Sequence, residues 1–373
     1  MADRNASLDG LRGIAAVSVV FYHAILHHEV LVQTTLIQPI QGMSTFRDVL
    51  TKIVLFMFNG NNAVLLFFVL SGFVLSLSLE KSTGSALSIT SKFVARRVCR
   101  LYPALFGCMA AYYLLSNVYA QMGWAGVPAP NAWLAALNAL LVQITWHGPS
   151  TTIQAEMLAV PFVLAFFFFQ KRFGSVSALV LFGLSVSAMA QPTFVMGAPP
   201  FMSTWISSFA IGMLIADKRF QPFFSGVSPL ALWLVIAAFM IVRMFVPFNP
   251  DASTLGEVIL CAALVGSVYY GDQSLPATKL LAHPVCRFLG KISYSFYLIN
   301  VLFLLVIWSL VDPLGIYPTH ALETGMVVGT VVIFLTIPFA YFSEKWLEQG
   351  GVTLGRFLTK PREPMQPVVA PAE

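Results

Sequence analysis

The first apolar segment carries two ionisable side chains, and together they are the strongest chemical signal in the chain. Arg12 stands where the apolar run LDGLRGIAAVSVVFYHA begins, and His23 lies eleven residues later, inside it. Titratable groups are costly in hydrocarbon, so a histidine within an apolar helix indicates a functional site. At about 1.5 Å per residue, the two side chains would lie roughly 16 Å apart along a helix. The structural alternative is an arginine that orients the helix and a histidine that bonds to a neighbouring one.

A second candidate is the basic motif FVARRVCRLYP, residues 93–103, which immediately precedes another apolar run. Arg97 and Arg100 are three residues apart, so they would share one helical face. The planar guanidinium group matches the geometry of phosphate oxygens, which favours a phosphorylated ligand at the inner membrane face. The alternative is charge that serves only to orient the helix.

A third candidate is Glu156 in TTIQAEMLAVP, at the outer start of a later apolar segment. No Lys or Arg lies within fourteen positions of it. A carboxylate that enters hydrocarbon tends to have a partner distant in sequence. His23 would belong to the same half of the membrane, and a carboxylate beside it would make the imidazole a stronger general base. A glutamate at the wet outer interface is the alternative.

The composition places these residues in a membrane protein. Of 373 residues, 58% are hydrophobic and only 10% are charged, whereas a soluble domain usually carries about 25% charged residues. Apolar runs recur without a long polar insert, so we predict an all-α, polytopic membrane helix bundle. Its single domain would cover residues 1–360, with a disordered tail at 361–373.

Ten transmembrane spans are predicted, at approximately 11–27, 62–79, 101–119, 155–170, 175–190, 202–216, 229–247, 255–271, 292–311 and 321–342. Residues 49–58 and 132–146 are also apolar. Each could form a short interfacial or re-entrant helix, so neither is counted as a span.

The distribution of charge predicts the topology. With the N-terminus in the cytoplasm, 18 of the 21 Lys and Arg residues fall on the inner side, and only Arg47, Lys52 and Arg243 fall outside. The positive-inside rule describes this asymmetry, which puts both termini in the cytoplasm and residues 120–154 outside. The net charge of +5 would then face anionic lipid or an anionic cytosolic ligand, and it is no sign of nucleic-acid binding.

Metal sites and disulfides are not expected. The four cysteines show no CxxC spacing, and none lies in a predicted outer loop. His27, His28 and Glu29 follow the first span, but adjacent residues on a helix do not face one point. Their adjacency is more typical of an interfacial loop than of a metal site.

Five motifs are spread over nearly the whole chain: LDGLRGIAAVSVVFYH at its start, FFVLSG at 67–72, RVCR at 97–100, LGKISYSFYLIN at 289–300 and FSEKWLE at 342–348. Together they resemble the opening helix, second-helix signature, basic motif, late helix and closing segment of the acyltransferase-3 family of integral membrane O-acyltransferases. Glu344 stands at the acidic position of the closing segment. Thr151 and Asn300 depart from the family pattern, which often has Trp and His at those positions.

The resemblance implies an acyl-CoA-dependent O-acyltransferase, multi-pass in the inner (plasma) membrane of a bacterium. It would move an acyl group, expected to be acetyl, from cytosolic acyl-CoA to a hydroxyl of a glycan, glycolipid or small molecule near the outer side. The implied catalytic residues are His23, Arg12 and Glu156. The implied acyl-CoA-binding residues are Arg97, Arg100 and Ser71, although Ser71 and Gly72 also suit close helix packing.

Two questions stay open at this point. His23 would act either as a general base on the acceptor hydroxyl or as a transient carrier of the acyl group. The rival class is a proton-coupled transporter, because intramembrane His and Glu in a ten-span protein would suit one as well. The chain shows neither the inverted repeat nor the paired broken helices common in transporters.

Overall fold

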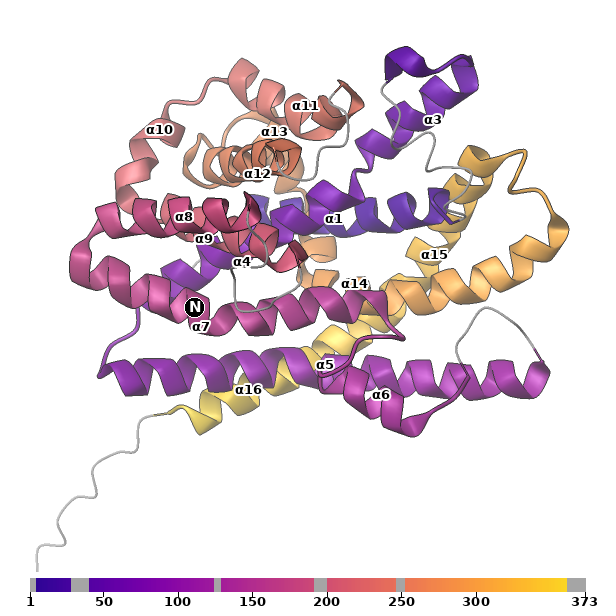
Figure 1. The fold of residues 1–373 in the computed structure, drawn as a ribbon, viewed down its shortest axis with the longest axis horizontal. Coiled ribbons are helices and arrows are strands. Elements are labelled where there is room, and N and C mark those ends of the chain that lie inside the picture. The colour runs from indigo at the N-terminus through magenta and orange to yellow at the C-terminus, as the bar shows by residue number, and fades with distance from the viewer. Residues whose placement is uncertain (1–4, 28–39, 124–128, 191–199, 246–251, 361–373) are drawn as a thin grey trace, which may run out of the picture.

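The computed structural model describes residues 5–27, 40–123, 129–190, 200–245 and 252–360, and within these ranges every regular element is a helix (Figure 1). The all-α prediction is therefore confirmed, while the predicted tail at 361–373 lies outside the described residues. The main helices are α1 (Ala6–Ile25), α3 (Phe46–Met57), α4 (Gly60–Glu80), α5 (Ala86–Met122), α6 (Ala132–Ala139), α7 (Gly148–Phe173), α8 (Ser175–Ala190), α9 (Pro200–Ile215), α10 (Gln221–Ser225), α11 (Pro229–Phe245), α12 (Ala252–Tyr270), α13 (Pro276–Leu281), α14 (Pro284–Val311), α15 (Ala321–Ser343) and α16 (Gln349–Leu358). A π-helical turn, η5 (Glu344–Glu348), joins α15 to α16.

Each of the ten predicted spans coincides with a helix, but the number of crossings stays a prediction. Within the described residues, six helical stretches are long and apolar enough to cross a membrane. A seventh arises if Lys218–Ser225 and Pro229–Val242, which are bent by 104°, form one broken span. The other three predicted spans correspond to the shorter apolar helices Val176–Ser187, Trp205–Ile215 and Thr254–Tyr270. The structure therefore supports a multi-pass membrane bundle.

The two apolar segments left uncounted are both helical in part. Residues 49–58 lie largely in α3, which forms one apolar stretch with α4 from Phe46 to Glu80. Residues 132–146 begin with α6, whose eight residues span only about 12 Å at 1.5 Å per residue. Since the hydrocarbon core is roughly 30 Å thick, α6 cannot cross it alone.

The largest difference from prediction concerns α5. This helix has 37 residues and begins at Ala86, well before the predicted span at 101–119. Charged residues interrupt a hydropathy pattern, but Lys and Arg are good helix formers, so the helix continues through them. As a result, the basic motif lies inside a long helix of roughly 55 Å instead of preceding it.

The directions of three helices define the two ends of the bundle. Near its start, α1 lies against the first turns of α14 at Gly13, and just beyond the ends of both helices His27 bonds to Asp312. These two helices therefore run in the same direction. In contrast, α15 runs the opposite way, because Gly325 near its start lies against Ile25 at the end of α1.

We call the end of the bundle at the start of α1 the proximal end, and the end at His27 and Asp312 the distal end. At the proximal end Ser7 bonds to Gln273 at 2.9 Å, and Tyr270 donates to the carbonyl of Ala216 at 3.2 Å. The start of α1 therefore lies beside the ends of α9 and α12. In the predicted topology the proximal end faces the cytoplasm, and this orientation stays a prediction.

Glycines allow the helices around α1 to meet backbone to backbone. A Cβ added at Gly290 in α14 would overlap the carbonyl oxygen of Asp9 in α1, and one at Gly10 would overlap that of Leu281. The same holds between α4 and α9, where Gly72 meets the carbonyl of Phe209. This contact confirms the packing interpretation of Gly72. Lipid provides no hydrophobic force between helices, so such close packing is a main source of their association.

Gly290→Ala should therefore destabilise the bundle, because the added methyl group meets backbone that cannot move aside. Overpacking of this kind typically costs about 1–3 kcal/mol. Thermal unfolding of the purified protein in detergent would measure the loss as a lower Tm. Gly183→Ala in α8 is the matched control, because no atom lies within 4 Å of its added Cβ. Equal Tm values for the two variants would contradict the close crossing.

Candidate functional site

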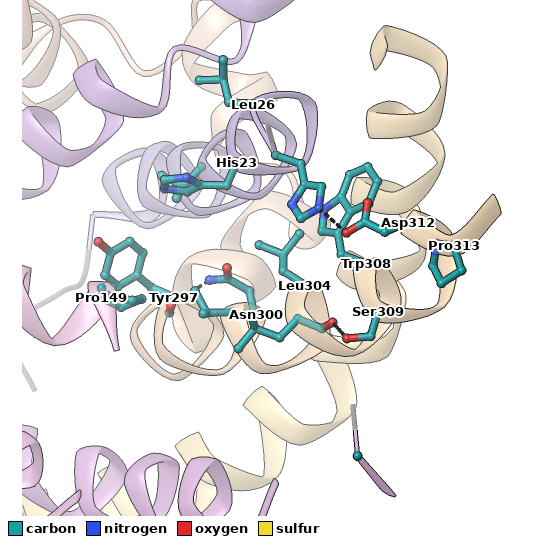
Figure 2. Close-up of a pocket in the computed structure, with 16 residues that line it drawn as sticks. His23, Leu26, Pro149, Tyr297, Asn300, Leu304, Trp308, Ser309, Asp312 and Pro313 are labelled. Carbon is teal, nitrogen blue, oxygen red and sulfur yellow. Dashed lines mark hydrogen bonds and ion pairs between the residues drawn. The ribbon is translucent and has the colours of Figure 1, made fainter. Parts of the chain in front are cut away.

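A cavity of about 840 Å³ lies between the distal halves of α1 and α14 (Figure 2). Its size falls within the roughly 300–1,000 Å³ of ordinary small-molecule sites. The start of α7 and the end of α5 complete its walls. The lining residues are Val19, His23, Leu26 and His27 from α1 and its end, Gly123, Gly148 and Pro149 from α5 and α7, and Tyr297, Asn300, Val301, Leu304, Leu305, Trp308, Ser309, Asp312 and Pro313 from α14 and its end.

His23 is exposed to this cavity, as Figure 2 shows. Its ring has an edge contact with the neighbouring Tyr22 at 5.7 Å, and no hydrogen bond to it is found among the described residues. Arg12 is half-buried near the proximal end of the same continuous helix. The helix thus confirms the axial separation of about 16 Å between the two side chains. The catalytic roles of both residues stay predictions.

The distal wall of the cavity holds an imidazole and carboxylate pair, formed by His27 just after α1 and Asp312 just after α14. His27 Nε2 lies 2.9 Å from Asp312 Oδ2, and the His27 ring stacks on Trp308 with centroids 3.8 Å apart. The four-residue spacing between His23 and His27 is the sequence signal for this position, because one further helical turn would put both side chains on the same side. His28 and Glu29 lie outside the described residues.

The α14 wall presents two polar side chains beside His23. The hydroxyl of Tyr297 lies 2.8 Å from Thr152 Oγ1 in α7. Asn300 is buried, and its Nδ2 donates to the carbonyls of Phe296 at 3.0 Å and Tyr297 at 2.7 Å. Its Oδ1 atom is buried and has no hydrogen-bond partner. Buried acceptors without a partner are uncommon in native proteins, so this one requires an explanation.

A second polar cluster joins three residues that the sequence had placed at different depths. Arg97 Nη2 donates to Glu156 Oε2 at 2.9 Å, and Ser71 Oγ donates to Glu156 Oε1 at 3.1 Å. The distant partner expected for Glu156 therefore exists, but it is Arg97 and not His23. No hydrogen bond joins Glu156 to His23 in the part of the chain that the structure describes.

The placement of Arg97 and Glu156 at opposite membrane faces was therefore wrong. Arg97 lies eleven residues into α5 and Glu156 eight residues into α7, or roughly 16 Å and 12 Å from the helix starts. Both helices extend beyond their apolar runs, so the two residues meet inside the bundle. The side chains of Arg97 and Glu156 are only 9% and 16% exposed, which makes this an ion pair largely shielded from solvent.

The basic motif is consequently split between two roles. Arg97 is buried against Glu156, whereas Arg100 and Arg96 are exposed. Arg96 Nε donates to Thr359 Oγ1 at 2.8 Å, which links α5 to the residue after α16. Binding of acyl-CoA phosphates by Arg97 and Arg100 stays a prediction, and of the two side chains Arg100 is the exposed one.

The closing motif FSEKWLE forms the π-helical turn η5, which brings two buried glutamates against α14. Glu348 Oε1 accepts hydrogen bonds from the backbone N–H and the hydroxyl of Ser295, at 3.2 and 2.5 Å. Glu344 Oε2 lies 3.3 Å from Lys291 Nζ. Arg100 is close enough to Glu348 to interact with it electrostatically. π-turns are rare and often mark functional positions, which fits this location beside Arg100.

One turn of α7 connects the ion pair to the cavity. Thr152 and Glu156 are four residues apart on this helix, so they share one face. Thr152 bonds to Tyr297 in the cavity wall, and Glu156 bonds to Arg97. The same face of α7 thus contacts Arg97 through Glu156 and the cavity wall through Thr152. Among the described residues, no group of three metal-ligating side chains is close enough to hold a metal ion.

The stability effects of substituting Arg97 and Glu156 should be strongly non-additive, because the two side chains form one buried ion pair. Removing one partner of such a pair leaves an uncompensated charge and typically costs about 3–5 kcal/mol. Arg97→Ala and Glu156→Ala should each lower the Tm of the purified protein, and the double variant should lose much less than the sum of the two. Arg100→Ala, an exposed arginine on the same helix, should leave the Tm almost unchanged. Additive losses would mean that the pair contributes no coupling.

Comparison with known proteins identifies the family of this chain. The family model for an acyltransferase domain, Acyl_transf_3, matches residues 5–344, which include the cavity, the ion pair and the first residue of η5. No curated protein and no solved structure matched the chain. The matched region covers almost all of the described helices, from the start of α1 to the end of α15. The chain therefore belongs to the acyltransferase-3 family of membrane acyltransferases.

Proposed function

We propose that this membrane acyltransferase moves an acyl group, acetyl in the simplest case, from cytosolic acyl-CoA to a hydroxyl of a glycan, glycolipid or small molecule at the opposite face. One observation carries the proposal. The histidine of the family-matched opening helix faces a cavity of substrate size at the distal end, and the basic motif lies toward the proximal end of α5. The enzyme would be a multi-pass protein of a bacterial inner membrane.

The donor would bind at the proximal end. Arg100 lies in the first half of α5 and is exposed, whereas Arg97 is buried. Guanidinium groups bind phosphate through paired N–H donors, so Arg100 is assigned to a phosphate of acyl-CoA. Arg97, held by Glu156, which also accepts from Ser71, would position the helix that carries Arg100. The thioester would then reach toward His23 between the helices.

The acceptor would enter the distal cavity. His23 would either take the proton from the acceptor hydroxyl or carry the acyl group between donor and acceptor. In both cases the acyl carbon exchanges its bond to sulfur for a bond to the acceptor oxygen, and the hydroxyl proton ends on the CoA thiol. A cavity shielded by packed helices would also protect the thioester from hydrolysis. Within the described residues, no contact favours the alternative of a proton-coupled transporter.

His23→Ala should abolish transfer, because loss of a general base typically costs about 10²–10⁴ in rate. The assay supplies radiolabelled acetyl-CoA to inverted membrane vesicles and measures both released CoA and label in the lipid and glycan fractions. His320→Ala is the control, since His320 also lies toward the distal end but does not line the cavity. A His23→Ala variant within threefold of the wild-type rate would remove His23 from the reaction.

Arg100→Ala should raise the KM for acyl-CoA and leave the KM for the acceptor unchanged. Arg100→Lys should restore affinity only in part, because an ammonium group keeps the charge but loses the two-pronged geometry. High salt should weaken the effect of the charge, since the residue is exposed and screened. Steady-state kinetics with each substrate varied in turn would measure this. A change confined to the acceptor KM would place the donor at the other end of the protein.

A further inference from the structure

The unpartnered oxygen of Asn300 lies in the wall of the cavity that holds His23. Asn300 is 1% exposed, and its amide orientation is determined by the two backbone carbonyls that accept from Nδ2. The carbonyls of Phe296 and Tyr297 require the nitrogen on their side, so Oδ1 must point the other way. Figure 2 shows the Asn300 amide on the α14 wall directed toward the α1 wall that carries His23.

The imidazole ring of His23 could donate the hydrogen bond that Asn300 Oδ1 lacks. A neutral imidazole has one N–H donor and one acceptor nitrogen, and no hydrogen bond of this ring is found in the described ranges. The two residues also lie at the same level. Gly13 of α1 lies against Gly290 of α14, and His23 and Asn300 each lie ten residues beyond these glycines on helices that run in the same direction. A buried acceptor and an unbonded donor thus face one space from two parallel helices.

The energetic cost of this arrangement favours a functional origin. A buried polar atom without a partner costs about 1–3 kcal/mol, and an apolar side chain of similar shape would avoid that cost. Catalytic hydrogen bonds are often unmade in a protein without substrate and form only in the complex. Both residues line the same cavity, so a change of the His23 rotamer is the motion by which its N–H would reach Asn300.

We infer that Asn300 is a positioning residue for His23: its Oδ1 accepts the imidazole N–H and so determines which ring nitrogen faces the substrate. The hydrogen bond at one nitrogen of a histidine selects the tautomer, and the other nitrogen then holds the lone pair used in catalysis. The amide would do here what a carboxylate does in a serine protease triad, without adding a charge to the membrane interior. The expected effect on kcat rests on the proposed function. The effect of Asn300 on the His23 tautomer does not depend on that function.

The kinetic test compares Asn300→Leu with Asn300→Asp. Leu has a similar branched shape but no acceptor, so kcat should fall about 10- to 100-fold while the KM for acyl-CoA stays within twofold and the Tm does not fall. Asp keeps an acceptor oxygen, so its kcat should be at least fivefold above that of the Leu variant. Asn300→Ala replaces Asn300→Leu in this comparison if the Leu variant does not fold.

Asn62→Leu is the matched control. Asn62 in α4 is also buried and also has an Oδ1 without a hydrogen-bond partner, but it does not line the cavity. Its kcat should equal that of the wild type. An Asn300→Leu variant with kcat within twofold of the wild type, or a loss of kcat that is the same in Asn62→Leu, would overturn the inference.

A spectroscopic readout separates this inference from the proposed function. In protein labelled with ¹⁵N-histidine, the His23 signals (assigned with His23→Gln) should report one tautomer in the wild type and a mixture in Asn300→Leu. Identical His23 spectra in the two proteins would contradict the positioning role even if acyl transfer is observed. A wild-type protein without acyl transfer but with a single, Asn300-dependent tautomer would count against the proposed function alone.

Discussion

The close crossing of α1 and α14 is the constraint on which the rest of the structure depends. Gly13 and Gly290 let the proximal halves of these helices meet backbone to backbone. With that contact made, the distal halves lie side by side at a separation that leaves a cavity lined from both helices. His23 on α1 and Asn300 on α14 therefore face one space because two glycines bring their helices together at the other end.

The buried pair of Arg97 and Glu156 is the second element of this arrangement. It ties α5 to α7 inside the bundle, and Ser71 adds α4 to the same contact. Paired charges cost far less than isolated ones in a low-dielectric interior, so each of these residues requires the other. Because Thr152 on the same face of α7 bonds to Tyr297, the pair also supports the cavity wall. One turn of α7 thus links the buried ion pair to the wall of the cavity that holds His23.

Much of the fold and part of the candidate site were predictable from the sequence. The all-helical class, the family, the ten helical segments and the prominence of His23 follow from apolar periodicity and from motifs that are local in the chain. The depth of Arg97 was not predictable, because hydropathy cannot tell a helix that continues through charges from one that starts after them. The bond between Arg97 and Glu156 joins residues 59 positions apart, and the unpartnered Oδ1 of Asn300 depends on which carbonyls its amide meets. Such features arise only from packing.

The most direct test of the account is a cryo-EM map of the protein with a non-hydrolysable thioether analogue of acetyl-CoA. The central claim is that one membrane domain holds the donor at its proximal end and carries the reaction to the cavity at His23. The account predicts density for the phosphates beside Arg100 and for the acyl end in the cavity beside His23. Phosphate density at the distal end, or an acyl end remote from His23, would contradict it.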